Sequence, residues 1–92
     1  MPYQENDSNL SAQTRDLHRA IDSLREELEA IDLYNQRADV VSDKDLKALL
    51  IHNRDEEKEH AAMLFEWLRR HDPELAKKAK EWVFTDKAFN HD

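Results

Sequence analysis

The sequence predicts an all-α protein: an antiparallel hairpin of two long helices followed by a short third helix. The 92 residues contain no glycine and only two prolines, and they are rich in Leu, Ala, Glu, Lys and Arg. These residue types favour helices, and apolar side chains recur along the chain at spacings of three and four. We therefore expect one domain, residues 1–92, with flexible ends at 1–12 and 86–92.

The first helix is expected from roughly Ser11 to Asp39. One of its faces is apolar, formed by Leu17, Ala20, Ile21, Leu24, Leu28, Ile31 and Tyr34. After this helix come two β-branched residues, and then Ser42 and Asp45, whose spacing is typical of a helix N-cap pair. The second helix is therefore predicted to begin at Ser42.

The second helix is expected to run to about Arg70 or His71. Asp72 before Pro73 predicts an N-cap with proline at the first helical position, and so a third helix that continues to about Phe84. A hairpin of two helices on its own leaves most of both apolar stripes in water. We therefore expect two copies to dimerise into a four-helix bundle.

The charge and composition exclude several classes of function. A net charge of -7 disfavours nucleic acid and anionic membranes as partners, since both are bound through clustered Lys and Arg. The chain has no cysteine, so a transition metal would have to be bound by Glu, Asp and His. No signal peptide is evident, and no run of about 18 apolar residues could span a bilayer. We expect a soluble, intracellular protein.

Three polar residues fall on apolar faces. Glu27 lies between Leu24 and Ile31 in the first helix, and Glu57 and His60 lie on the apolar row of the second. With the turn near residues 41 and 42, Glu27 precedes it by about 14 residues and Glu57 follows it by about 16, so the helical rise places them at one height.

Buried carboxylates are costly unless they are compensated, and a metal cation compensates them. Glu57 and His60 form a Glu-x-x-His element, and di-iron bundles combine two such elements with two single glutamates. Glu27 is the single glutamate here, so two copies of the chain would supply a complete set of ligands. The site is therefore predicted to lie between subunits, with a di-iron centre shared by two chains.

Other interpretations of these residues stay open at this point. The three could form a buried salt-bridge network with Arg54 or Lys58, or lie on an ordinary solvated face. Tyr34 could donate a hydrogen bond near the metal, act as a redox-active ring, or pack in the core. The remaining histidines match no such pattern and are treated as structural or surface residues: His18, His52, His71 and His91.

The segments EELEAIDLYNQRAD and HNRDEEKEHAAMLFEWLRR resemble the encapsulated ferritins, two-helix ferritin-like proteins packed inside encapsulin nanocompartments. The resemblance covers about residues 15–86. It implies a ferroxidase centre of Glu27, Glu57 and His60 from both chains, with Tyr34 close by. It also implies a metal entry site for iron or other divalent cations at Glu26 and Glu29, a ring of ten subunits, and an encapsulin shell in the cytoplasm as the partner.

The sequence departs from that family at two places. Leu33 stands where some relatives have a tryptophan before the tyrosine, so a second aromatic ring is missing near the site. The peptide that directs such cargo into a shell is not evident in TDKAFNHD. Neither departure changes a metal ligand.

The predicted function is a ferroxidase that oxidises Fe(II) to Fe(III) with dioxygen for iron storage inside an encapsulin compartment. One alternative is a metal-binding or buffer protein that uses the same ligands without turnover. A second is a structural oligomerisation module whose inward charges only fix the register of the helices. A di-manganese oxidase or peroxidase-like enzyme is also consistent with the ligands.

Overall fold

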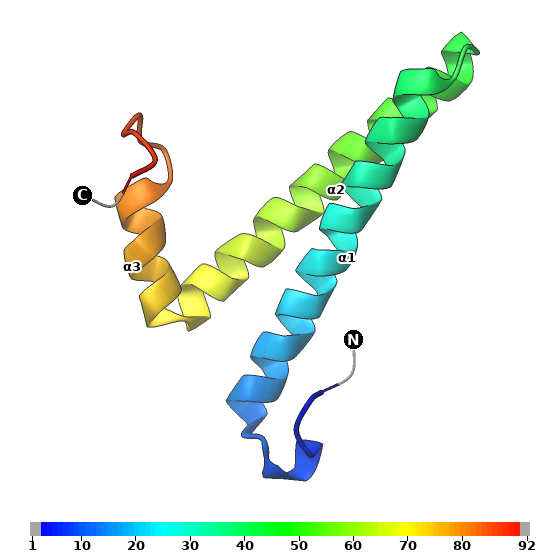
Figure 1. The fold of residues 1–92 in the computed structure, drawn as a ribbon. Coiled ribbons are helices and arrows are strands. Elements are labelled where there is room, and N and C mark those ends of the chain that lie inside the picture. Colours follow the sequence, from blue (N-terminus) through cyan, green and yellow to red (C-terminus); the bar gives the residue numbers. More distant parts are fainter. Residues whose placement is uncertain (1–2, 91–92) are drawn as a thin grey trace.

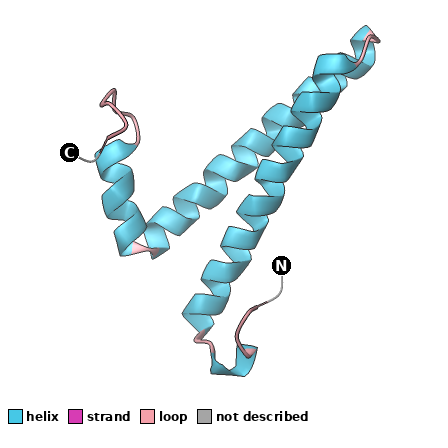
Figure 2. Ribbon diagram, in the orientation of Figure 1, coloured by secondary structure: helices cyan, strands magenta, loops and turns pink. Residues whose placement is uncertain are grey.

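A computed structural model describes residues 3–90, which form three α-helices and a short 3-10 helix, η1. The α-helices are α1 (Ala12–Val40), α2 (Lys44–His71) and α3 (Pro73–Trp82), and η1 (Asp7–Asn9) precedes α1. α1 and α2 lie side by side as an antiparallel hairpin, and α3 turns back from the end of α2 (Figure 1). The described residues contain no strand (Figure 2). The predicted helix class and order are confirmed.

The N-caps follow the sequence at two helices and differ from it at one. Ser11 caps α1 by accepting a 3.0 Å hydrogen bond from the Thr14 amide. The prediction of Ser42 as the cap of α2 is wrong, because Asp43 accepts a 2.8 Å bond from the Leu46 amide instead. Aspartate caps as well as serine does, and its charge also favours the positive end of the helix.

The third helix is shorter than predicted. Asp72 caps it and Pro73 opens it, as the sequence indicates. The expected end near Phe84 is wrong by two residues, because α3 ends at Trp82. The backbone leaves the helix at Val83, which is extended with φ −76° and ψ 135°, and Phe84 follows with a left-handed φ of 61°, so neither residue continues a right-handed helix.

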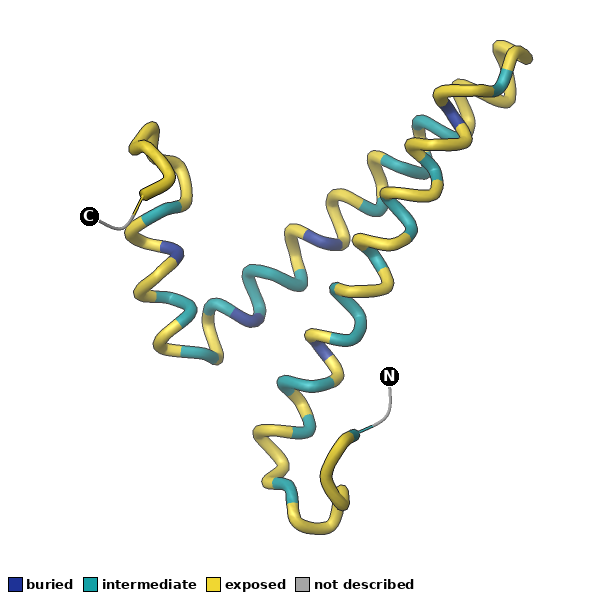
Figure 3. The backbone as a smooth tube through the Cα atoms, in the orientation of Figure 1, coloured by how far each residue is buried: buried dark blue, intermediate teal, exposed yellow. Residues whose placement is uncertain are grey.

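The hairpin packs through small side chains. The buried apolar residues are Ala20, Ala38, Ala61, Leu68 and Ala79. They are isolated positions along otherwise half-buried or exposed helices (Figure 3). Within residues 3–90 no large side chain is completely buried, whereas Leu28, Leu49 and Met63 are each more than half exposed. A single copy therefore leaves much of its apolar surface in water.

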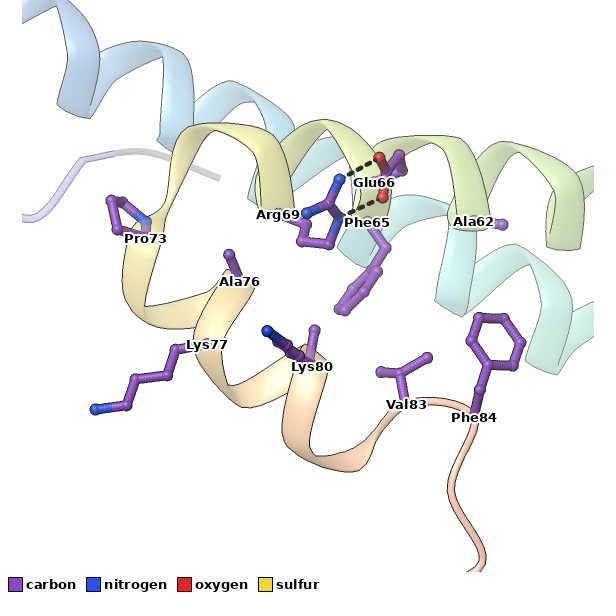
Figure 4. A pocket seen from close by; sticks show the side chains of 11 residues that line it. Ala62, Phe65, Glu66, Arg69, Pro73, Ala76, Lys77, Lys80, Val83 and Phe84 are labelled. Atoms are coloured by element: carbon purple, nitrogen blue, oxygen red, sulfur yellow. Dashed lines mark hydrogen bonds and ion pairs between the residues drawn. The ribbon is translucent and has the colours of Figure 1, made fainter.

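A groove of about 880 Å³ lies between the end of α2 and α3. Phe65 extends into it from α2, and Val83 and Phe84 border it beyond α3 (Figure 4). Glu66 and Arg69 form part of its wall and are joined by two hydrogen bonds of 2.6 and 2.7 Å. No helix in the described range combines the length and the apolar character that a membrane span needs.

The position of the α2 cap can be tested by mutation. Asp43→Ala removes the acceptor for the Leu46 amide and should destabilise the protein by about 1 kcal/mol. Ser42→Ala is the matched control and should have little effect, because Ser42 does not accept that bond. Urea unfolding at fixed protein concentration measures both variants. A larger loss in Ser42→Ala would contradict the observed cap.

Glu66 should make stability depend on acid pH. Hydrogen bonds from Arg69, and then from Arg70, lower the pKa of its carboxyl from 4.5 to about 2. A carboxyl group whose pKa is lower in the folded than in the unfolded state stabilises the folded state at pH values above its unfolded pKa. This stabilisation is lost as the pH falls through the pKa of the folded state. Glu66→Gln should therefore lower the melting temperature at pH 7.

The difference in melting temperature between Glu66→Gln and wild type should shrink as the pH falls from 4.5 to about 2. Circular dichroism melts at a series of pH values measure it. Glu81→Gln, which changes an exposed glutamate on α3, is the control. An equal, pH-independent loss in both variants would contradict the assignment.

Candidate metal centre

The hairpin brings together the three polar residues that the sequence places on apolar rows. Glu27 comes from the middle of α1, and Glu57 and His60 come from consecutive turns of α2. Each offers one ligand atom, and these atoms all lie within 4.8 Å of one another. This separation suits three donors around one cation, and the group is the only such cluster found among residues 3–90. The predicted register between the helices is therefore present.

The histidine lies between the two carboxylates. His60 Nδ1 is 3.6 Å from Glu27 Oε2 and 3.4 Å from Glu57 Oε2. These distances are longer than a good hydrogen bond and leave the three groups close together without being bonded to one another. The side chains of Glu27 and Glu57 are 23% and 24% exposed, whereas that of His60 is 49% exposed. The group therefore opens to the outside on the histidine side.

One carboxylate oxygen in this group makes no hydrogen bond. Glu27 Oε2 is buried, and its contact with His60 Nδ1 at 3.6 Å is an ion pair only when the imidazole is protonated. A buried carboxylate oxygen without a hydrogen bond loses its hydration with little compensation, which costs a protein several kcal/mol. A divalent cation bound by Glu27, Glu57 and His60 would offset this cost. Two carboxylate oxygens and an imidazole are suitable ligands for iron, manganese or zinc.

The salt-bridge alternative named Arg54 or Lys58 as the compensating cation, and both are engaged elsewhere. Arg54 donates to Asn35 at 3.0 Å and to Asp55 at 3.1 Å. Lys58 lies 3.5 Å from Asp55. The bond from Arg54 is the main reason that the pKa of the Asp55 carboxyl is lowered. Neither the Arg54 nor the Lys58 side chain forms an ion pair or hydrogen bond with Glu27 or Glu57.

The other predicted site residues lie outside the three-residue group. Glu26 and Glu29 are exposed on α1, and neither belongs to the set of converging ligands. Tyr34 is half-buried, with the Arg37 guanidinium 5.7 Å from the centre of its ring. It follows Glu27 by two helical turns, or about 10 Å along the axis. Any part these three play is therefore indirect in a single chain.

The remaining histidines make local contacts. His18 packs against Tyr3, with ring centroids 4.5 Å apart, and His52 lies 3.6 Å from Glu56. His71 stacks on Trp67 at 3.9 Å and pairs with its carbonyl oxygen at 2.7 Å. His91 lies outside the described residues.

One feature beside the site was not predicted from the sequence. A hollow of about 340 Å³ is lined by His60, Met63, Leu64 and Trp67. The spacing of three and seven residues from His60 could have indicated it, because those positions share one helical face. The hollow links the exposed edge of the candidate site to an apolar surface.

A helical hairpin with a carboxylate and imidazole cluster at its centre is half of a ferritin-like bundle. Residues 2–86 match the family model described as EncFtn-like. The chain belongs to this family, which confirms the resemblance noted from the sequence.

Two curated relatives carry related descriptions. An "Encapsulated ferritin-like protein" of Rhodospirillum rubrum is 54% identical over 77 residues, which cover 84% of this chain and 55% of the relative. A "Ferritin-like protein" of Thermotoga maritima is 48% identical over 85 residues, covering 92% of this chain and 75% of the relative. The chain thus spans only about half the length of the Rhodospirillum protein.

A third relative and a solved structure extend the comparison. The "Encapsulin nanocompartment cargo protein EncC" of Myxococcus xanthus is 48% identical over 61 residues, or 66% of this chain and 47% of that protein. The crystal structure of protein ne0167 from Nitrosomonas europaea matches with a TM-score of 0.93 and 62% identity, covering 99% of this chain and all of that one. The fold of this chain is thus also that of an experimentally determined protein.

Removing the buried carboxylate should separate a metal site from a structural network. Because Glu27 Oε2 has no hydrogen-bond partner, Glu27→Gln should leave the metal-free protein at least as stable as wild type. The same change should remove most of the rise in melting temperature that anaerobic Fe(II) produces, because a bound ligand stabilises only the form that binds it.

Glu59→Gln is the matched control, since Glu59 is an exposed glutamate on α2 and lies outside the converging group. Calorimetry of chelator-treated protein, with and without Fe(II), measures both the stability of the metal-free protein and the rise in melting temperature that Fe(II) produces. A Glu27→Gln variant that is clearly less stable without metal, yet gains as much from Fe(II) as wild type does, would identify a structural network instead.

Proposed function

We propose that the protein is a ferroxidase, in which two copies of the chain face each other and together bind a pair of Fe(II) ions. The observation that carries this proposal is the convergence of Glu27, Glu57 and His60 around a buried carboxylate oxygen that makes no hydrogen bond. Family membership supports it, because a ferritin-like assembly supplies the second set of ligands that one hairpin lacks.

One chain offers too few ligands for a pair of iron ions. Glu27, Glu57 and His60 provide two carboxylates and one imidazole, and a twofold axis through the site would give four carboxylates and two imidazoles. His60 is half exposed in the single chain, and this edge is where a partner would complete the site. The nearby exposed side chain of Met63 would be covered by the same contact.

Fe(II) is the substrate of the proposed reaction. Two Fe(II) ions each lose one electron, and one dioxygen molecule takes up both electrons with two protons, which gives two Fe(III) ions and hydrogen peroxide. The carboxylates of Glu27 and Glu57 favour this direction because hard anionic oxygens bind Fe(III) more strongly than Fe(II). His60 retains affinity for Fe(II), so that the substrate binds before it is oxidised.

The acidic surface beside the site suits delivery of cations. Glu26 and Glu29 are exposed on α1, on the helix that carries Glu27. We assign them an entry role for Fe(II) or another divalent cation, through attraction of charge at the surface. We assign Tyr34, two helical turns from Glu27, a supporting role as a hydrogen-bond donor or a redox-active ring.

The cellular setting follows from the described role of a relative. The Myxococcus xanthus relative is a cargo protein of an encapsulin nanocompartment. By analogy, this chain would store iron inside an encapsulin shell in the cytoplasm, and the ring of ten subunits expected from the resemblance would be the form enclosed. The exposed apolar side chains of the hairpin are consistent with such an assembly.

Iron oxidation by matched histidine variants tests the proposal. His60→Ala should slow the formation of Fe(III) by at least about tenfold, since even changes in the outer partners of metal sites have effects of that size. His52→Ala is the control: it lies on the same helix, is 67% exposed, and pairs only with the exposed Glu56. The measurement is Fe(III) absorbance together with oxygen uptake after air reaches protein loaded anaerobically with Fe(II).

Oxidation should be confined to oligomeric fractions and saturate at about one iron per chain, as a site shared by two chains requires. Tight binding of Fe(II) without oxygen uptake would favour a metal buffer. Normal assembly with neither binding nor oxidation would favour a structural module. Equal rates in His60→Ala and His52→Ala would overturn the site assignment.

A further inference from the structure

Met63 lies beside the candidate iron site and is exposed in the single chain. It follows His60 by three positions, so the two side chains share one face of α2. Both line the same hollow of about 340 Å³, and Met63 is 64% exposed. The sequence has two methionines and no cysteine, so Met63 carries the only sulfur atom besides that of Met1, which lies outside the described residues.

The hollow favours the thioether as the point of attack. Trp67, the other oxidisable side chain in it, is half-buried and stacked on the ring of His71. The thioether of methionine is readily oxidised to a sulfoxide, which is polar and can be reduced back by dedicated enzymes. In a pair of chains this face is covered, and an oxidant formed at His60 then meets Met63, one helical turn away, before it can leave the contact.

We propose that Met63 is a modification site, oxidised to the sulfoxide by hydrogen peroxide formed at the adjacent iron site. This inference rests on the proposed ferroxidase function, which supplies the oxidant. The sulfur lone pair attacks one oxygen of the peroxide, and a new S–O bond forms as the O–O bond breaks. The second oxygen leaves as hydroxide and takes up the proton that the attacked oxygen loses, which gives the sulfoxide and water. The sulfur loses two electrons and the peroxide gains them.

The modification limits the activity that causes it. Met63 belongs to the exposed apolar surface next to His60, the edge where a second copy would complete the site. A sulfoxide there places a polar, bulkier group on a surface that has to be desolvated when subunits pair. Oxidised chains should therefore pair less tightly, and iron oxidation should slow over successive cycles.

The experiment compares Met63 with a second methionine placed farther away. Leu49→Met adds one on the same helix, at a position with similar exposure, 55% against 64%. It lies about 16 Å from His60 along the axis, and Leu-to-Met changes are well tolerated. The Leu49→Met protein is loaded with Fe(II) anaerobically and exposed to air with catalase present, and sulfoxide at each methionine is measured by peptide mass spectrometry.

The expected result is sulfoxide at Met63 several-fold above that at residue 49, dependent on iron, and lost when His60→Ala is added. Hydrogen peroxide added in bulk should oxidise both methionines in all proteins, which shows that the thioether stays reactive in the His60→Ala background. The Met63→Leu variant should keep its rate and oligomeric state through repeated cycles in which wild type declines.

Two results would overturn the inference in different ways. If iron is oxidised fast and Met63 stays unmodified, the inference is overturned while the proposed function stands. The same holds if both methionines are oxidised equally and catalase prevents this oxidation. No acceleration of iron oxidation over buffer, with no sulfoxide, overturns both.

Discussion

The close approach of α1 and α2 is the constraint on which the rest of the structure depends. The residues buried along the hairpin are mainly alanines, with Ala20 and Ala38 on α1 and Ala61 on α2. Small side chains let two helix axes come near each other, and longer residues at these positions would push the helices apart. Only at a short separation can Glu27 reach across to Glu57 and His60. The same alanines therefore explain both the hairpin and the cluster of ligands within 4.8 Å.

This way of packing has a cost, because alanine buries little apolar surface. Burial of a large aliphatic side chain contributes about 1.5–3 kcal/mol, and the hairpin leaves its larger side chains, such as Leu28 and Leu49, more than half exposed. A chain of this size can seldom stabilise itself through one small core. Pairing with a second copy would bury those side chains and complete the metal ligands at once, so stability and chemistry both point to the same contact.

Much of the fold and the centre of the site could be predicted from the sequence, because both follow from helical periodicity. Glu27, Glu57 and His60 were placed together by counting residues from the turn, and helical rise is nearly constant. The N-cap could not be fixed in this way, since Ser42 and Asp43 are both good caps and the turn geometry decides between them. The end of α3 depends on the extended backbone at Val83 and the left-handed backbone at Phe84, which no side-chain pattern reveals. The hollow that Met63 shares with His60 also depends on side-chain positions that the sequence does not give.

A site divided between two chains links reactivity to assembly. A lone hairpin presents two carboxylates and a half-exposed imidazole, a set that could bind one cation but does not enclose a pair of metal ions. In the proposed reaction, the electrons that dioxygen needs would come from two Fe(II) ions held together, so a single chain would be a poor catalyst even if it bound metal. Pairing would supply the second ion, exclude water from the apolar surface beside His60 and strengthen the electrostatic attraction between carboxylates and cations. Because the ligands and this apolar surface lie on the same face, a change that weakened the surface would also remove half of the ligands, and the proposed chemistry would stop with the loss of the contact.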